Sequence, residues 1–287
     1  MSKSFLIIGI DGKISQELNR QLIKKGTQII GTTRKIQINE SNTLIALDLS
    51  TEQPTFNCPD NIESAFFGIA ETRLSECSVF PEKTSHINVT NTIKIIKKIV
   101  DKNGFVIFPS TNLVFDGILS NCSPETLVNP KTEYGRQKAI VEKELLSWGS
   151  KIAIIRFSKI LSPETPLFHS WIRDLQKNKK IYPFYDMVMA PIPISFAGEV
   201  IMRVADDKAT GIIQVSGIRD ITYADAARYI ADRMGCNADL IHPISCHSAN
   251  PVLEHAPLHT TLDTSRLQQE FGLTPPDVWA TLDSAFG

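Results

Sequence analysis

Residues 4–15 read SFLIIGIDGKIS, an apolar run followed by a glycine turn. Ser4–Ile8 is an apolar run of the kind found in strands buried on both faces of a parallel sheet. Gly9 and Gly12 break the run, after which apolar residues recur at helical spacing as far as Gly26. A strand, a glycine turn and a helix in this order are typical of a site that binds a dinucleotide pyrophosphate.

The glycine turn suits phosphate for two physical reasons. Glycines allow the backbone to turn tightly and to approach a ligand, and the helix N-terminus offers N–H groups and the positive end of the helix dipole. Ser15 holds the third small position, where many such turns have glycine, and it still allows close helix–strand packing. The same pattern also fits a plain strand-to-helix turn, although its context favours a cofactor site. The candidate cofactor-binding residues here are Gly9, Asp11, Gly12, Lys13 and Ile14.

Further along the chain, apolar strands alternate with helices. The predicted strands cover residues 27–31, 44–47, 64–67, 105–108 and 151–156, and the predicted helices cover 90–100 and 133–146. This alternation predicts an α/β fold with a Rossmann-type, doubly wound parallel sheet. We expect residues 1–157 to form an NADP-binding Rossmann domain, with elements from about 190–215. Residues 158–287, punctuated by prolines, should form a smaller, mixed, mainly substrate-binding lobe.

The end of the second predicted strand discriminates between cofactors. NAD sites often have an acidic residue there for the ribose hydroxyls, whereas NADP sites have a cation for the 2′-phosphate. Here residues 31–35 read GTTRK, without a carboxylate. Arg34 offers a planar fork for phosphate and Thr33 a hydroxyl, so we expect NADP(H). A solvated basic pair in a loop is the alternative. Asp48 and Leu49, after the third strand, are candidates to lie beside the adenine, or Asp48 is an ordinary turn residue.

A tyrosine and a lysine four residues apart form the candidate catalytic pair. Tyr134 and Lys138 fall on one face of the helix predicted over 133–146. A tyrosine hydroxyl has a pKa near 10, and a neighbouring ammonium is expected to lower it. Thr111 lies in the PSTNLVFDG stretch of residues 109–117, after the fifth strand, at the sheet edge where such folds bind ligands. Its hydroxyl is placed to hold a carbonyl that Tyr134 protonates.

These motifs together resemble the extended short-chain dehydrogenase/reductases, and most of all the dTDP-4-dehydrorhamnose reductase group. The resemblance rests on the glycine turn, the 110–117 stretch, the Tyr134/Lys138 pair with Glu142, and Arg156. It implies that reduced nicotinamide gives hydride to a sugar 4-ketone. Tyr134 would donate the proton, Lys138 would bind the nicotinamide ribose and Thr111 would position the carbonyl. It also brings in Ala70, Thr72 and Asn88 by their spacing, the first two as cofactor-binding residues.

Several positions depart from the family pattern. The polar residues that the family carries in its substrate lobe are replaced here by the pairs Leu167-Phe168 and Ala256-Pro257 and by the stretch at residues 186–192, DMVMAPI. Asn112 and Leu113 follow Thr111 where the family often has Asp-Tyr. The resemblance therefore implies a reductase acting on a nucleotide-linked or related sugar, without identifying that sugar.

Two other functions stay open from the sequence. A dehydratase of the same superfamily usually has a carboxylate beside the catalytic threonine, which Asn112 and Leu113 do not supply, and an epimerase usually keeps NAD, which Arg34 disfavours. A non-catalytic NADP-binding regulatory or scaffold subunit is favoured by the altered substrate lobe. The intact Thr111, Tyr134 and Lys138 set disfavours it.

Composition bounds the remaining possibilities. The 287 residues carry a formal net charge of −1, which argues against a nucleic-acid binder. No apolar stretch approaches the roughly 18 residues of a membrane span. The odd cysteine count, five without CxxC spacing, fits reduced thiols and a cytoplasmic location.

Two further features of the chain could serve an assembly or a metal. Ile93, Ile96 and Val100, together with the helix over 133–146, suit either a homodimer face or burial in the monomer. Four histidines lie between His242 and His259, but prolines make this segment loop-rich. We therefore expect no metal there.

Overall fold

The computed structural model describes residues 4–34, 44–248 and 255–286. By its internal contacts the chain divides into two compact units. Unit 1 comprises Met1–Val114, Val128–Arg156 and Ser195–Ile213, and unit 2 comprises Phe115–Leu127, Phe157–Ile194 and Gln214–Gly287. The chain therefore leaves unit 1 and returns to it twice.

A parallel sheet organises unit 1. Within the described residues it has seven strands, which are, in sheet order, β10 (Gly211–Val215), β6 (Ile152–Phe157), β5 (Phe105–Thr111), β4 (Ile62–Phe67), β1 (Ser4–Ile8), β2 (Ile29–Thr33) and β3 (Leu44–Ala46). The chain steps outward from β1 to β3 and then crosses back to β4, which pairs with the other side of β1. Folds of this type bind ligands beyond the carboxyl ends of the strands at such a reversal.

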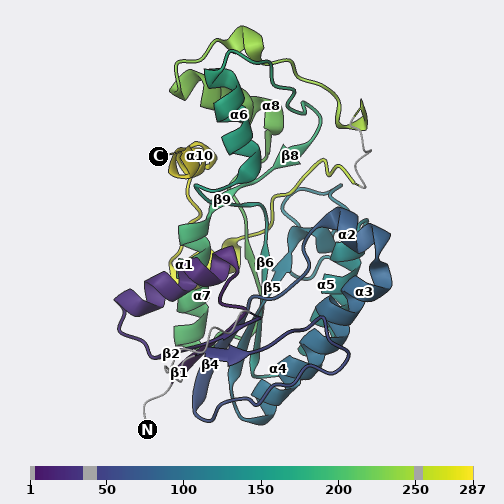
Figure 1. The fold of residues 1–287 in the computed structure, drawn as a ribbon, viewed down its shortest axis with the longest axis vertical. Helices are drawn as coiled ribbons and strands as arrows, with labels where there is room; N and C mark the ends of the chain where they lie inside the picture. The colour runs from purple at the N-terminus through teal and green to yellow at the C-terminus, as the bar shows by residue number, and fades with distance from the viewer. Residues whose placement is uncertain (1–3, 35–43, 249–254, 287) are drawn as a thin grey trace. The chain divides into compact units, whose positions relative to one another are not determined.

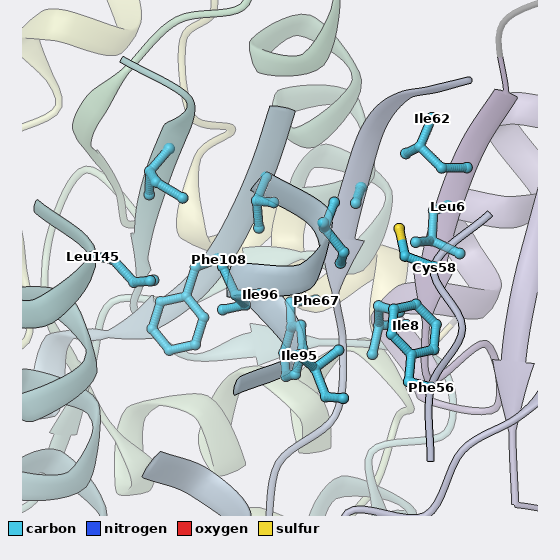
Figure 2. Packing of buried hydrophobic residues seen from close by; sticks show 14 of the residues in the cluster. Leu6, Ile8, Phe56, Cys58, Ile62, Phe67, Ile95, Ile96, Phe108 and Leu145 are labelled. Atoms are coloured by element: carbon cyan, nitrogen blue, oxygen red, sulfur yellow. The ribbon is translucent and has the colours of Figure 1, made fainter. Parts of the chain in front are cut away.

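Helices cover both faces of this sheet. Figure 1 shows α4 (Thr92–Asp101) and α5 (Glu133–Leu146) on one side, and α1 (Lys13–Lys24) and α7 (Ile194–Asp207) on the other. The side chains between the sheet and α4 and α5 form a continuous apolar core, shown in Figure 2, which includes Leu6, Phe67, Ile95, Ile96, Phe108 and Leu145. Burial on both faces explains why β1 reads as an unbroken apolar run.

A π-helical segment precedes α4. After the short helices α2 (Leu74–Val79) and α3 (Pro81–Ser85), the chain forms η1 (His86–Asn91). The side-chain amide of Asn91 donates to the carbonyl oxygens of Leu49 and Thr51, both at 2.9 Å. These bonds fix the segment that follows β3 to the end of the π-helix, directly before α4.

Unit 2 has smaller sheets than unit 1 and more loops between its helices and strands. It contains the two-stranded pairs β7 (Ile160–Leu161) with β9 (Ile192–Pro193) and β8 (Val188–Met189) with β11 (Ile221–Thr222). Its core is built by the helices α6 (Pro166–Gln176), α8 (Tyr223–Arg233) and α10 (Val278–Phe286). Phe168 and Met189 lie in that core, so the apolar residues at these positions serve packing. The short helix α9 (Ser265–Phe271) completes the unit.

The fold class predicted from the sequence is confirmed: the sheet is Rossmann-like, and small sheets follow it. The predicted strand bounds shift by a few residues. The strand predicted over 105–108 extends to Thr111 in the structure. The prediction followed only the apolar run, and the last three residues of the strand are Pro109, Ser110 and Thr111. All five cysteines are free thiols. Among the described helices, none has the length and apolar character needed to cross a membrane.

Candidate functional site

The glycine turn follows β1, as predicted. Gly9 adopts a φ of 80°, a left-handed conformation that favours glycine. A Cβ on Gly9 would stand 2.4 Å from Cγ1 of Ile69, so the turn also needs glycine for space. Its position is set by β2: the Gly9 N–H donates to Oγ1 of Thr32 at 2.8 Å and the Ile10 N–H to the Thr32 carbonyl at 2.9 Å.

The start of α1 has the features that a pyrophosphate requires. Gly12 precedes the helix with no side-chain capping bond, and Lys13, which opens it, is exposed. A Cβ on Gly12 would lie 3.5 Å from the carbonyl oxygens of Gly9 and Gly68 and from Oγ of Ser15, which is ordinary van der Waals contact. Ser15 is buried against Gly68, where a Cβ would come within 2.2 Å of the serine oxygen. The close packing predicted for the third small position is thus confirmed. The turn fits a dinucleotide phosphate.

The end of β2 differs in part from the expected arrangement. Arg34 is exposed, whereas the hydroxyl of Thr33 is buried and donates to Oδ2 of Asp11 at 2.6 Å. The sequence predicted that Thr33 and Arg34 bind the 2′-phosphate together. To bind a phosphate through its hydroxyl proton, Thr33 would have to give up its hydrogen bond to Asp11. Lys35 lies outside the described residues.

Asp48 and Leu49, which lie just beyond β3, have different environments. Oδ1 of Asp48 accepts from the backbone and the hydroxyl of Ser50, at 2.8 and 2.7 Å. These bonds hold the pKa of Asp48 below its ordinary value, with a smaller contribution from Arg34. The Leu49 side chain is buried in the apolar core. Asp48 bonds to Ser50 as an ordinary turn residue does, which is one of the two alternatives that the sequence left open for it.

The catalytic candidates converge on the carboxyl end of β5. Thr111 ends that strand, and its Oγ1 accepts from the Leu113 N–H at 3.2 Å. Gly135 explains how α5 comes so close: a Cβ there would stand 2.1 Å from the Leu113 carbonyl oxygen. The Thr132 hydroxyl caps the helix by accepting from the Gly135 N–H at 3.0 Å. Tyr134, the residue before Gly135, therefore lies beside the turn that follows Thr111.

Lys138 lies one helical turn beyond Tyr134 and is tied to the same strand end. Its Nζ donates to the Pro109 carbonyl at 2.7 Å and lies 5.7 Å from the centroid of the Tyr134 ring. Glu142 follows one turn later and forms a buried ion pair with Arg156, Nη2 to Oε2 at 2.7 Å. Both of these side chains are only 3% exposed, so each charge depends on the other.

Burial controls the protonation of the pair. It raises the pKa of the Tyr134 hydroxyl above its ordinary value, with a further rise from the nearby Cys77 thiol. It lowers the pKa of Lys138 to about 7, although Glu142 and Cys77 act in the opposite direction. The sequence predicts that Lys138 lowers the pKa of Tyr134, whereas burial holds the pKa of this hydroxyl above its ordinary value here. Desolvation disfavours the charged form of both groups and is the largest cause of each shift.

A buried amide network, not foreseen in the sequence, positions the loop that carries Ala70 and Thr72. Asn88 in η1 accepts from the Glu71 N–H at 2.8 Å and donates to the Glu71 carbonyl at 2.9 Å. The same amide donates to Oε1 of Gln137 at 2.7 Å. Gln137 is fully buried and also donates to Thr84 and Glu133, at 2.9 and 2.8 Å. The spacing of Asn88 was a signal, but the sequence did not indicate Gln137.

The hydroxyl of Ser110, the residue before Thr111, is a buried polar group to which the sequence gave no role. Within the part of the chain that the structure describes, its buried Oγ has no hydrogen-bond partner, and the same holds for Oγ of Ser15. An unsatisfied buried hydroxyl carries an energetic cost, which a bound ligand can remove. Both atoms belong to the segments that the sequence assigns to cofactor and substrate.

Unit 2 holds a compact cluster around the predicted loop histidines. Asp186, Cys246 and His247 bring one potential metal-ligand atom each within 4.8 Å of one another. Both carboxylate oxygens of Asp186 are already used by the Ser245 hydroxyl and the Cys246 N–H, at 2.5 and 2.7 Å. Although burial opposes it, these bonds lower the pKa of Asp186 to about 2. The position and the charge of the Asp186 carboxylate are therefore explained by its hydrogen bonds to Ser245 and Cys246.

His259 has a carboxylate partner of its own. Its Nδ1 lies 3.2 Å from Oδ2 of Asp220, which also receives the Thr261 hydroxyl. The other oxygen of Asp220 accepts from the backbone and the hydroxyl of Thr260. Asp220, which is held in place by its bonds to Thr260, therefore orients the His259 ring.

Comparisons with known proteins agree on one family. The family model described as the RmlD substrate binding domain matches residues 3–286. A dTDP-4-dehydrorhamnose reductase of Aggregatibacter actinomycetemcomitans is 24% identical, over 95% of this chain and 94% of its own length. The beta subunit of methionine adenosyltransferase 2 of Bos taurus is 25% identical, over 69% of this chain and 62% of its own.

Solved structures share the fold. The dTDP-4-dehydrorhamnose reductase of Bacillus anthracis, in complex with NADP, superposes with a TM-score of 0.84 at 16% identity, covering 100% of this chain and 99% of that one. MoeE5 in complex with UDP-glucuronic acid and NAD gives 0.83 at 17% identity, with coverage of 99% and 97%. The chain therefore belongs to the RmlD substrate-binding domain family, a dTDP-4-dehydrorhamnose reductase-like group of the extended short-chain dehydrogenase/reductases.

Proposed function

We propose that this protein is an NADPH-dependent reductase of a keto group on a nucleotide-linked or related sugar. The observation that carries the proposal is the arrangement at the end of β5, where the Pro109 carbonyl holds Lys138 beside Tyr134 and α5 packs on the turn after Thr111. The curated relative named dTDP-4-dehydrorhamnose reductase supports the same reaction class.

Each side chain has a distinct task in this proposal. A bound reduced nicotinamide supplies the hydride when it occupies the site. Thr111 donates a hydrogen bond to the substrate carbonyl oxygen, which polarises it. The raised pKa of Tyr134 keeps the phenol protonated at neutral pH, so it holds a proton to transfer as negative charge develops on that oxygen. Lys138 anchors the nicotinamide ribose.

The cofactor would be held by unit 1. Gly9, Asp11, Gly12, Lys13 and Ile14 would surround the pyrophosphate at the start of α1, and Arg34 would meet the 2′-phosphate. Solved relatives contain NADP in one case and NAD in another, so the choice depends on this chain's own residues. The exposed guanidinium of Arg34 favours NADPH.

Replacement of Arg34 by Ala tests this choice of cofactor. We expect the variant to bind NADPH about tenfold more weakly and NADH with unchanged affinity, because only the 2′-phosphate contact is lost. Titration of reduced-nicotinamide fluorescence measures both affinities. Equal losses for the two cofactors would show that Arg34 does not contact the 2′-phosphate.

The reductase itself is tested by NADPH consumption against a panel of 4-keto nucleotide sugars. We expect at least one member to be reduced, with the product carrying deuterium from [4-²H]NADPH. If NADPH binds but every ketone is refused, the alternative of a non-catalytic NADP-binding subunit gains support. A specific observation favours that alternative: one relative is, by its name, a subunit of another enzyme.

A further inference from the structure

Three side chains that can bind a metal meet in unit 2, although they come from segments far apart in the sequence. Residues 181–184 and 241–244 lie side by side and are bridged in parallel register. Asp186 follows the first segment, and Cys246 and His247 follow the second. Because the two segments run in the same direction, these side chains lie together, and one potential ligand atom from each lies within 4.8 Å of the other two.

The fold supplies a ligand that the local sequence does not. Sequence pattern alone predicts no metal in the loop-rich segment between His242 and His259, because it considers only the side chains of that segment. The structure adds the Asp186 carboxylate, which lies 60 residues before Cys246 in the chain. The set then contains one sulfur, one nitrogen and one oxygen ligand. Zinc accepts all three donor types, whereas magnesium and calcium prefer oxygen alone.

The Asp186 carboxylate keeps the capacity to bind an ion. Its Oδ2 accepts from the Ser245 hydroxyl at 2.5 Å and its Oδ1 from the Cys246 N–H at 2.7 Å. The Cys246 thiol is hydrogen-bonded to the same carboxylate. A zinc ion would take the place of the thiol proton, forming bonds to sulfur and to a carboxylate oxygen, while the proton passes to solvent.

Ser245 holds two of the ligands in position. Its hydroxyl donates to Asp186 and accepts from the His247 N–H at 3.2 Å. Cys246 is buried and His247 is exposed, so the sulfur is fixed and the imidazole is able to turn toward an ion. Zinc with bonds of about 2.0–2.3 Å separates its tetrahedral ligand atoms by about 3.5 Å, which a turn of the exposed ring can reach. Hydrogen bonds that orient ligands in this way are a general feature of metal sites.

We propose that Asp186, Cys246 and His247 bind one zinc ion. Three protein ligands leave the fourth tetrahedral position to water, as in open zinc sites rather than closed structural ones. The ion fastens the turn over residues 245–247 to the segment that leads into β8. This inference goes beyond the proposed reductase and does not depend on it, because none of the three ligands is assigned to the cofactor or to the ketone.

The test measures zinc affinity for the wild type and His247→Ala, after EDTA has stripped both proteins, by competition with a chromophoric chelator. We expect the wild type to bind one zinc ion per chain and His247→Ala to bind it at least about 100-fold more weakly. The His247 side chain is exposed, so its removal should leave the fold intact. His169→Ala removes another exposed histidine of unit 2 and should keep the wild-type affinity.

Cobalt tests whether the sulfur is a ligand. Co²⁺ should give the wild type a thiolate-to-cobalt charge-transfer band that Cys246→Ser lacks. Cys236→Ser, a change at another free thiol of unit 2, should keep the band. Zinc should also raise the unfolding temperature of the wild type but not that of His247→Ala.

Three results would overturn the inference. A wild type that binds no zinc has no such site. Equal zinc affinities of the wild type and His247→Ala, or a cobalt complex without the thiolate band, would indicate an adventitious ion only. Each of these results leaves the proposed reductase standing, since NADPH consumption is measured separately on the EDTA-treated protein.

Discussion

Lys138 is the residue at which burial and charge oppose each other most directly. It is buried, donates to the Pro109 carbonyl and is 4.4 Å from the centroid of the Phe108 ring. Its pKa falls to about 7 because burial removes the water that would solvate the ammonium. A group that changes charge near neutral pH beside Tyr134 affects both stability and proton transfer.

This pKa predicts how stability depends on pH. Between about pH 7 and pH 10, unfolded Lys138 keeps a proton that the folded protein has lost, so the free energy of unfolding should rise with pH. One such proton contributes about 1 kcal/mol per pH unit. Urea unfolding across this window should therefore show a steeper rise for the wild type than for Lys138→Met. Identical slopes would mean that Lys138 stays charged in the folded protein.

At the scale of secondary-structure elements, the π-helix η1 holds the loops that follow β3 and β4. Its Asn88 binds both backbone groups of Glu71, and its Asn91 binds the carbonyls of Leu49 and Thr51. Gln137 connects this segment to α5. Wider π-helical turns are frequent at functional sites. Here the segment ties the loops after β3 and β4 to α5, the helix that carries the proposed catalytic pair.

Substitution of Gln137 tests this connection. Gln137→Leu leaves buried partners unsatisfied, so it should lower the free energy of unfolding by about 2–3 kcal/mol in urea denaturation. Arg136→Ala, on the exposed side of the same turn, is the control and should cost less than about 1 kcal/mol. If the two variants lose equal stability, the network does not anchor α5.

The face of α4 bears on the assembly of the whole molecule. Ile96 is fully buried in the core of unit 1, and Ile93 and Val100 pack against the same core. The stripe that the sequence offered as a possible dimer face is thus occupied within the monomer. On α5, by contrast, Ile140 and Leu146 are exposed.

Ile96→Ala should therefore destabilise the fold without changing its mass in solution. Loss of a fully buried isoleucine costs about 2–5 kcal/mol. Light scattering should give the wild-type mass, and Lys97→Ala should change neither quantity appreciably. A halved mass at unchanged stability would place Ile96 in an interface between two copies.

Much of the molecule could be predicted from local sequence patterns. The helix over 133–146 has the predicted bounds, because its cap at Thr132 and its apolar spacing are local signals. The contacts of Asn88 span 17 residues to Glu71 and 49 to Gln137, and no periodicity encodes such pairs. The Asp11–Thr33 bond spans 22 residues, and the pKa of Tyr134 depends on burial by the assembled fold.

In the proposed reaction, Tyr134 gives the proton that the reduced ketone takes up. The most direct measurement is the rate of NADPH-dependent reduction by the wild type and Tyr134→Phe, with the NADPH dissociation constant measured for both. We predict that the variant loses at least about 100-fold in rate and binds NADPH as the wild type does. A Tyr134→Phe protein that reduces the ketone at the wild-type rate would show that Tyr134 is not the proton donor.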